Sequence, residues 1–235
     1  MEMRKKIGWI LAYVLTLGGA LAAVHGGNQA VKVVSENMGI PRKTCIVIDA
    51  GHGGEDGGAI SCTGRMESEY NLEISLRLRD LLHLLGYKTI MIRTTDESVC
   101  TTGETIAARK SSDLKNRVKI VNDTPQALLL SIHQNQFPDS RYQGAQVFYA
   151  GTQGSHELAV QLQTELVDKL NRGSHRKAKR SNGVYLMEKI INPGVLIECG
   201  FLSNYEEEAR LANPSYQKKL CSVIVCTLDQ FLSGA

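Results

Sequence analysis

The chain lacks features that mark several other classes of protein. Its six cysteines include no C-x-x-C pair, so the sequence gives no support to a cysteine-based zinc ribbon. The formal net charge is only +3, and nothing in the overall charge points to nucleic acid. No internal repeat is present, and 235 residues suffice for one domain with a full core but are short for two. With 43% hydrophobic and 22% charged residues, the chain is predicted to form one ordinary globular domain.

The amino terminus predicts export. Residues 4–6 are basic and precede a stretch without charged residues, 7–24, which is typical of a signal peptide or an amino-terminal membrane anchor. This stretch is at the lower limit for spanning a bilayer but long for the apolar part of a signal peptide. An uncleaved anchor is therefore favoured, although Ala20 to Ala22 would suit signal peptidase. We expect an anchor or signal segment at 1–25, a polar linker at 26–43 and the folded domain at 44–235.

The pattern of the remaining chain predicts an α/β domain. Strands alternate with helices, which indicates a mostly parallel sheet with helices on both faces. We expect strands at 44–49, 87–92, 127–132, 145–149, 184–187 and 195–199. We expect helices at 67–85, 114–121, 155–170, 206–211 and 214–232, and a polar loop at 97–112.

Three runs that read as buried strands are each followed, or ended, by a residue suited to metal binding or acid/base chemistry. These residues are His52, His133 and Glu198, and a fourth, Glu67, lies at the expected start of a helix. In an open α/β sheet, ligands bind outside the carboxyl ends of the strands. Two histidines, a carboxylate ligand and a spare carboxylate at that place suggest a zinc hydrolase.

Each of these residues is weaker evidence when it is taken alone. A lone histidine such as His52 or His133 is more often structural, and Glu67 could be a solvated carboxylate favoured by the helix dipole, with Glu69 as its competitor. Glu198 is the least ordinary, because a carboxylate near the end of a buried strand is partly desolvated. Desolvation would raise the pKa of Glu198, which suits a general base.

Four segments of the chain match, in order, the motifs of a known family. The motif Asp-x-Gly-His-Gly-Gly is matched by Asp49 to Gly54, and a Glu followed four residues later by Asn-Leu is matched by Glu67, Asn71 and Leu72. The motif Ser-x-His-x-Asn is matched by Ser131, His133 and Asn135. The motif Glu-x-Gly-Phe-x-x-Asn is matched by Glu198, Gly200, Phe201 and Asn204. In these segments the chain resembles the zinc-dependent N-acetylmuramoyl-L-alanine amidases of the Amidase_3 type. The resemblance covers Cys45 to about Leu232.

The resemblance implies a site and a reaction. One Zn²⁺ per chain would be held by His52, Glu67 and His133, and Glu198 would be the catalytic acid/base. Asn135 and Arg93 would contact the substrate, peptidoglycan. The bond that is cut would join the lactyl group of N-acetylmuramic acid to L-alanine. A zinc peptidase acting within the stem peptide would use the same chemistry, so the spacing of these residues does not exclude it, and a non-catalytic relative that binds peptidoglycan or a partner is a further alternative.

Further features are similar to one subgroup, the germination-specific spore-cortex amidases of endospore-forming bacteria. They are the basic stretch Arg176–Arg180, the continuation Gly183–Leu186 and the amino-terminal anchor. This similarity implies action in spore cortex during muramic-δ-lactam formation, coupled to a muramic acid deacetylase, and an activating or tethering partner protein is a further expectation. The enzyme would then be placed in the forespore intermembrane space.

Two groups of residues stay open at this point. The cations Arg172, Arg176, Lys177, Lys179 and Arg180 crowd one short segment. They form either a solvated loop after a helix or a positive surface for an anionic wall polymer or a partner protein. Among the cysteines, Cys62 and Cys100 are the one pair predicted to be worth testing for a disulfide.

Overall fold

The computed structural model describes residues 43–234. The predicted anchor, and all but the last residue of the predicted linker, lie outside this range. Within 43–234, no helix has both the length and the apolar character needed to cross a bilayer.

The centre of the fold is a six-stranded sheet with the strand order β2-β1-β3-β6-β4-β5. The four strands β2, β1, β3 and β6 are parallel to their neighbours. β4 is antiparallel to β6, and β5 is parallel to β4. The strands are β1 (Cys45–Ala50), β2 (Lys88–Met91), β3 (Ala127–Asn135), β4 (Gln146–Tyr149), β5 (Lys179–Arg180) and β6 (Gly194–Phe201).

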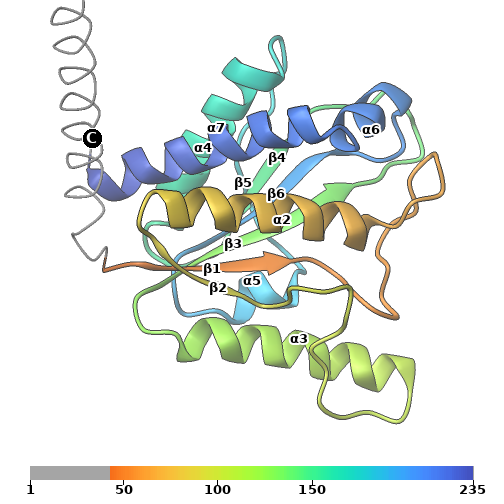
Figure 1. The fold of residues 1–235 in the computed structure, drawn as a ribbon, viewed down its shortest axis with the longest axis vertical. Helices are drawn as coiled ribbons and strands as arrows, with labels where there is room; N and C mark the ends of the chain where they lie inside the picture. The colour runs from red at the N-terminus through yellow and green to blue at the C-terminus, as the bar shows by residue number, and fades with distance from the viewer. Residues whose placement is uncertain (1–42, 235) are drawn as a thin grey trace, which may run out of the picture. The chain divides into compact units, whose positions relative to one another are not determined.

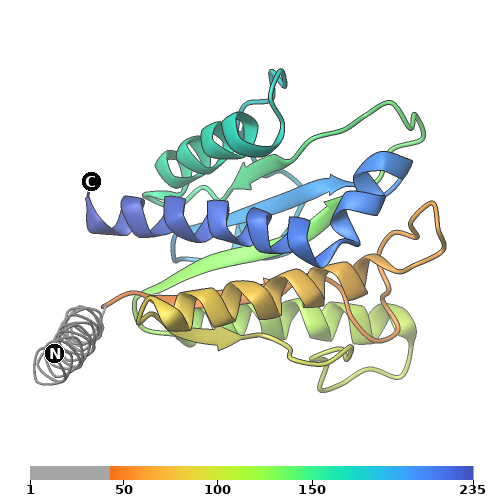
Figure 2. The same ribbon diagram turned by 45° about the horizontal axis from the view of Figure 1, so that its top comes forward.

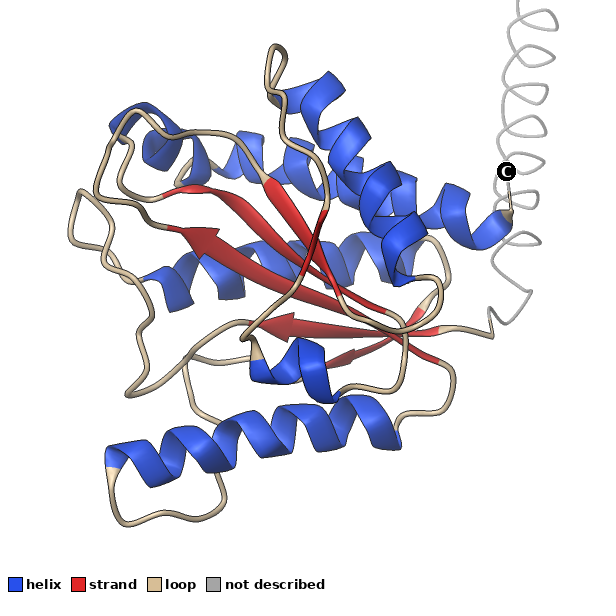
Figure 3. Ribbon diagram, turned by 180° about the vertical axis from the view of Figure 1, so that it is seen from behind, coloured by secondary structure: helices blue, strands red, loops and turns tan. Residues whose placement is uncertain are grey.

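Helices cover both faces of this sheet (Figures 1 and 2), which confirms the predicted α/β class. One face is covered by α2, α4 and α7, and the other by α3 and α5, which lie at the bottom of Figure 3. The helices are α2 (Glu67–Leu84), α3 (Ile106–Asp123), α4 (Ser155–Leu170), α5 (Tyr185–Lys189), α6 (Tyr205–Leu211) and α7 (Pro214–Ser233).

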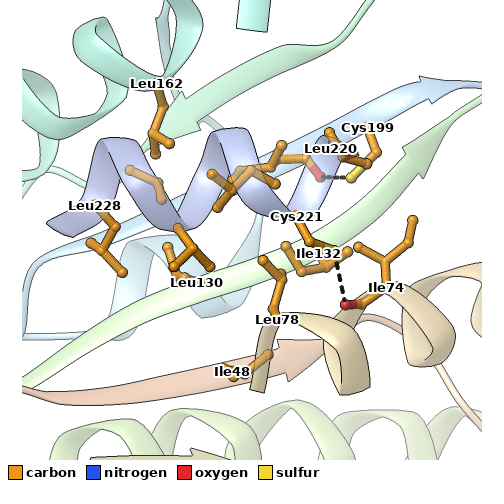
Figure 4. Packing of buried hydrophobic residues seen from close by; sticks show 14 of the residues in the cluster. Ile48, Ile74, Leu78, Leu130, Ile132, Leu162, Cys199, Leu220, Cys221 and Leu228 are labelled. Carbon is orange, nitrogen blue, oxygen red and sulfur yellow. Dashed lines mark hydrogen bonds between the residues drawn. The ribbon is translucent and has the colours of Figure 1, made fainter. Parts of the chain in front are cut away.

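The central strands are apolar on both sides because both sides are covered. Ile46 and Ile48 of β1 pack into the cluster beneath α2, α4 and α7, whereas Val47 packs toward α3 and α5. Figure 4 shows the first cluster, in which Ile74 of α2 and Leu220 of α7 meet the sheet. These contacts hold the central strands in place, and therefore also position the residues that follow each strand.

The structure corrects three sequence-based expectations and adds one strand that was not expected. Residues 184–187 are not a strand, because the short helix α5 occupies Tyr185–Lys189. α3 begins at Ile106 rather than at 114, and Thr105 caps it by accepting a hydrogen bond from the Ala108 backbone N–H. The two-residue strand β5 was not expected, since both its residues are charged and exposed. All six cysteines are free, so the suggested bridge between Cys62 and Cys100 is wrong.

Candidate metal centre

The sheet topology brings the four predicted site residues together. His52 follows β1 by two residues, His133 lies near the end of β3, and β1 and β3 are adjacent and parallel. Glu198 in β6 is the register partner of His133. Glu67 is the first residue of α2. Because parallel strands end at the same edge of a sheet, residues more than a hundred positions apart in the sequence meet there.

Three of these side chains converge on one point. Nε2 of His52 lies 3.3 Å from Oε2 of Glu67, and Nδ1 of His133 lies 3.0 Å from Oε1 of the same carboxylate. One potential ligand atom from each of the three residues lies within 4.8 Å of the other two. His52 and His133 also face each other edge to face, with ring centroids 5.0 Å apart. This is the one such group among residues 43–234.

Two glycines make this convergence possible. A Cβ at position 51 would lie 2.3 Å from the His133 ring. A Cβ at position 58 would lie 2.6 Å from Oε2 of Glu67 and 2.8 Å from the His52 ring. Any side chain at either position would therefore displace a member of the cluster. His52 itself has a φ of 61°, an uncommon left-handed conformation for a residue that is not glycine.

The carboxylate of Glu67 is held from several sides. The Asn71 side-chain amide donates to Oε1 at 3.1 Å, and the Ala59 backbone N–H donates to Oε2 at 3.0 Å. The Gln134 backbone N–H donates to Oε1 at 3.1 Å. Burial alone would raise the pKa of Glu67, but hydrogen bonding and charge from His133, aided by His52, lower it to about 2. Glu67 is therefore an anion at neutral pH and is fixed in place.

Glu198 lies next to the cluster and does not share its hydrogen bonds. It is half-buried, and its Oε2 is enclosed without a hydrogen-bond partner among the described residues. Burial raises the pKa of Glu198 to about 7; His133 opposes this shift and the Glu67 charge adds to it. The carboxyl group can therefore gain and lose a proton near neutral pH, as a general acid/base must.

Asp56 was missed by the sequence analysis. Its Oδ2 lies 3.1 Å from Nδ1 of His52, on the side of the ring away from Glu67, and 3.0 Å from Nζ of Lys110 on α3. The contact to His52 is close, although it is not aligned as a hydrogen bond. Because Asp56 lies in a glycine-rich turn, no helical or strand periodicity predicts where its side chain lies. Its separation of four residues from His52 was the only feature of the sequence that could have suggested this contact.

A buried ion pair holds the start of the His52 turn. Nη1 of Arg117 lies 2.5 Å from Oδ1 of Asp49, and Nε of Arg117 lies 2.6 Å from Oδ2 of Asp113. Arg117 also donates to the backbone oxygens of Ala50 and His52 at 3.0 and 2.7 Å. Burial would raise the pKa of Asp49, but Arg117 holds it below its usual range. α3 is thus attached directly to the turn that carries a cluster residue.

The two residues predicted to contact substrate differ in their surroundings. Arg93 is 4% exposed, and its guanidinium donates to the backbone oxygens of Ala50, Gly51, Ser68 and Thr95. These contacts hold the turn and argue against direct contact with substrate. Asn135 is half-buried at the end of β3, and its side chain makes no hydrogen bond to the described residues. Its contact with substrate stays a prediction.

An α/β sheet that gathers two histidines and a carboxylate at its carboxyl edge, beside a further carboxyl group, has the arrangement of a metallohydrolase. Residues 46–230 match the family model described as N-acetylmuramoyl-L-alanine amidase. The chain belongs to this family and is an enzyme of that class.

Individual relatives agree with this assignment. The chain is 42% identical over 229 residues to the germination-specific N-acetylmuramoyl-L-alanine amidase of Bacillus subtilis, covering 94% of this chain and 93% of the relative. It is similar in structure to the CwlD amidase of Clostridioides difficile in complex with the GerS lipoprotein, with a TM-score of 0.78, 36% identity, and coverage of 82% of this chain and 100% of the other. A second amidase, from Clostridium difficile 630, has a TM-score of 0.70 and 29% identity, with coverage of 82% and 98%.

Proposed function

We propose that this enzyme uses one bound zinc ion to hydrolyse the amide bond between the lactyl group of N-acetylmuramic acid and L-alanine in peptidoglycan. The observation that carries this proposal is the cluster of His52, Glu67 and His133 with Glu198 in register beside it. The family assignment supplies the identity of the bond, and the geometry supplies the chemistry.

The residues present fit a zinc ion. Two imidazoles and one carboxylate form a donor set typical of catalytic zinc, which keeps a fourth position for water or substrate. Their ligand atoms already converge, and Asp56 lies against His52 as carboxylates do in many zinc sites. When bound, the ion would polarise the scissile carbonyl and make water more acidic.

The chain's own residues then account for the proton movements. Glu198 accepts a proton from the attacking water as the oxygen adds to the lactyl carbonyl carbon. It returns that proton to the nitrogen of L-alanine as the carbon–nitrogen bond breaks, so the products are a carboxylic acid and a free amine. The enclosed and unpaired Oε2 of Glu198 supports this role.

The test combines zinc content with the products of digestion. Purified full-length protein is expected to contain about one zinc per chain and to release new L-alanine amino termini from peptidoglycan. Glu198→Ala should retain zinc but lose about 10²–10⁴-fold in rate, the usual scale for a positioned acid/base. His52→Ala and His133→Ala should lose the metal instead.

Other outcomes would assign other functions. Zinc with a new amino terminus from inside the stem peptide would make the enzyme a stem-peptide peptidase. Zinc without cleavage of any peptidoglycan would favour a binding role, and absence of zinc after metal reconstitution would overturn the proposal. Full activity of Glu198→Ala with zinc bound would remove Glu198 from the mechanism.

We further propose a role in spore cortex during muramic-δ-lactam formation, where a muramic acid deacetylase would act on the stripped sugar. The B. subtilis relative, named germination-specific, supports this context. A protein partner is supported by the relative solved with the GerS lipoprotein. The site of action would be outside the cytoplasmic membrane, in the forespore intermembrane space. Loss of muramic-δ-lactam from the cortex of a deletion strain would test this role.

A further inference from the structure

A groove beside α4 combines an apolar wall with several cations. It has a volume of about 640 Å³ and lies between α4 and the segment that precedes β5. This volume falls within the range of known ligand sites. The side chains that define its character are Val160, Val167, Ala178, Arg172, Arg176 and Lys177.

The cations of this groove are held by backbone contacts but form no direct ion pair, although the charges of Asp168 and Glu207 act on Arg172 and Arg176 from a longer distance. Nε of Arg172 donates to the backbone oxygen of Asp168, and Nε of Arg176 donates to the backbone oxygen of Gln143, both at 3.1 Å. Among residues 43–234, no carboxylate pairs with Arg172, Arg176 or Lys177, and the terminal nitrogens of both arginines make no hydrogen bond. The acidic residue in the groove, Asp168, instead pairs with Lys169 at 2.6 Å. Each guanidinium is therefore held through Nε, while its two terminal nitrogens, Nη1 and Nη2, make no hydrogen bond to the described residues.

The groove begins at the same edge of the sheet as the metal-type cluster. β4 is antiparallel to β6, so the segment before β5 lies beside the carboxyl end of β6. The Arg176 guanidinium carbon lies 4.9 Å from the centroid of the Phe201 ring. The backbone oxygen of Lys177 accepts a hydrogen bond of 2.8 Å from Gln146, which is the register partner of Glu198.

The neighbouring cations have a simpler explanation. Lys179 and Arg180 form the exposed edge strand β5, and charged residues on an edge strand prevent pairing with other chains. Arg172 lies outside every strand, and Arg176 and Lys177 precede β5, so this explanation does not cover them. The cations that the edge strand does not explain are therefore those that line the groove.

We propose that this groove binds the carboxylate groups of a peptide stem of peptidoglycan, a proposal that rests on the proposed function. Such stems carry methyl side chains and free carboxylates, which match an apolar wall flanked by cations. Arginine forks bind planar carboxylates through two parallel hydrogen bonds. Because both forks are already held through Nε, little side-chain entropy is lost on binding.

The test is equilibrium binding of a fluorescent stem tetrapeptide to the full-length protein. The ligand control is the same peptide with its carboxylates converted to amides. The double variant Arg172→Gln/Lys177→Gln removes two groove charges. Lys218→Gln/Lys219→Gln, on an exposed part of α7, removes the same charge elsewhere. We expect the acid peptide to bind about tenfold more tightly than the amide, and the groove variant alone to lose this preference.

Several results would overturn the assignment. These are equal affinity for the acid and amide peptides, an unchanged affinity in the groove variant, or tighter binding of a phosphate polymer than of the acid peptide. The probe has no muramyl group and is not cleaved, so the measurement does not depend on amidase activity. Glu198→Ala is expected to bind it as tightly as the wild type, which separates failure of this proposal from failure of the proposed function.

Discussion

At the scale of single residues, the protonation of Glu198 should set the pH dependence of the reaction. Burial raises its pKa to about 7, and a divalent cation bound nearby would lower that value. A general base works only when it is deprotonated, so kcat should rise with pH along an acid limb centred at or below about 7. The pH–rate profile of a soluble muropeptide measures this limb. Its persistence in Glu198→Gln would assign the limb to another group.

A second residue-scale prediction concerns Asp56. Its carboxylate lies 3.1 Å from Nδ1 of His52 and should orient the ring and favour the tautomer that presents Nε2 to the cluster. Removal of such a carboxylate usually weakens metal binding by about 10–100-fold. Asp56→Asn should therefore show this loss in chelator competition, with kcat largely restored at saturating zinc. Asp96→Asn is the matched control, since Asp96 is in a nearby loop and contacts Gly54 and Arg93 rather than His52.

The placement of His52, His133 and Glu198 could be predicted from sequence by a simple rule of topology, whereas Glu67, at the start of a helix, was assigned through the family resemblance. A polar residue at the end of an apolar strand has few structural explanations, and parallel strands end together. Asp56 and Asn71 could not be assigned in this way. Their roles depend on side-chain contacts, which no periodicity encodes. For Arg93, the resemblance suggested substrate contact, and the structure shows its guanidinium donating to backbone oxygens, so the predicted contact stays a prediction.

At the scale of elements, α3 is attached to the sheet by charge as well as by apolar packing. Its buried residues are Ser112, Asp113, Arg117 and Val121, three of which are polar. This composition explains why its first half looked like a loop in the sequence. The apolar run at 184–187 was predicted to be a strand but forms part of the short helix α5. Its apolar residues Leu186 and Met187 are buried in the cluster that includes Val121 of α3.

Arg117→Met should therefore destabilise the fold strongly. It would leave Asp49, which is 1% exposed, as a buried charge without its partner, and such a change costs about 3–5 kcal/mol. Arg109→Met on the same helix breaks an exposed pair with Glu55 and should destabilise the fold far less, because solvent screens exposed ion pairs. Urea denaturation of both variants measures the difference. Equal losses would show that the helix, and not the buried pair, accounts for the effect.

The same pair predicts the direction of acid destabilisation. The folded pKa of Asp49 is lowered, so its contribution to stability is present above the unfolded pKa and is lost as pH falls through the folded value. The pH dependence of stability that comes from Glu198 has the opposite sign. Its pKa is raised in the folded state, so it stabilises the fold at pH values below its unfolded pKa, and this contribution is lost as pH rises toward about 7. The free energy of unfolding of Asp49→Asn should vary less with pH on the acid side than that of the wild type.

At the scale of the whole molecule, the amino-terminal prediction needs its own test. The uncharged stretch 7–24 follows three basic residues, and we propose that it remains attached as an anchor. The full-length protein should then sediment with membranes, and mass spectrometry should detect peptides from residues 1–25. A soluble protein that begins near residue 23 would show instead that the segment is a cleaved signal peptide.

The attachments of α3 also have a thermodynamic meaning. Its ion pairs to Asp49, Glu55 and Asp56 tie the helix to the turn that carries His52. A metal that binds only the folded turn would therefore also stabilise the helix attached to that turn. At a free metal concentration of one hundred times the dissociation constant, the free energy of unfolding would rise by about 2.7 kcal/mol. Amide hydrogen exchange in α3 should slow when zinc is added, although no atom of that helix lies in the ligand set. In such an enzyme, the opening rate of a helix that supplies no metal ligand would depend on whether the metal is bound.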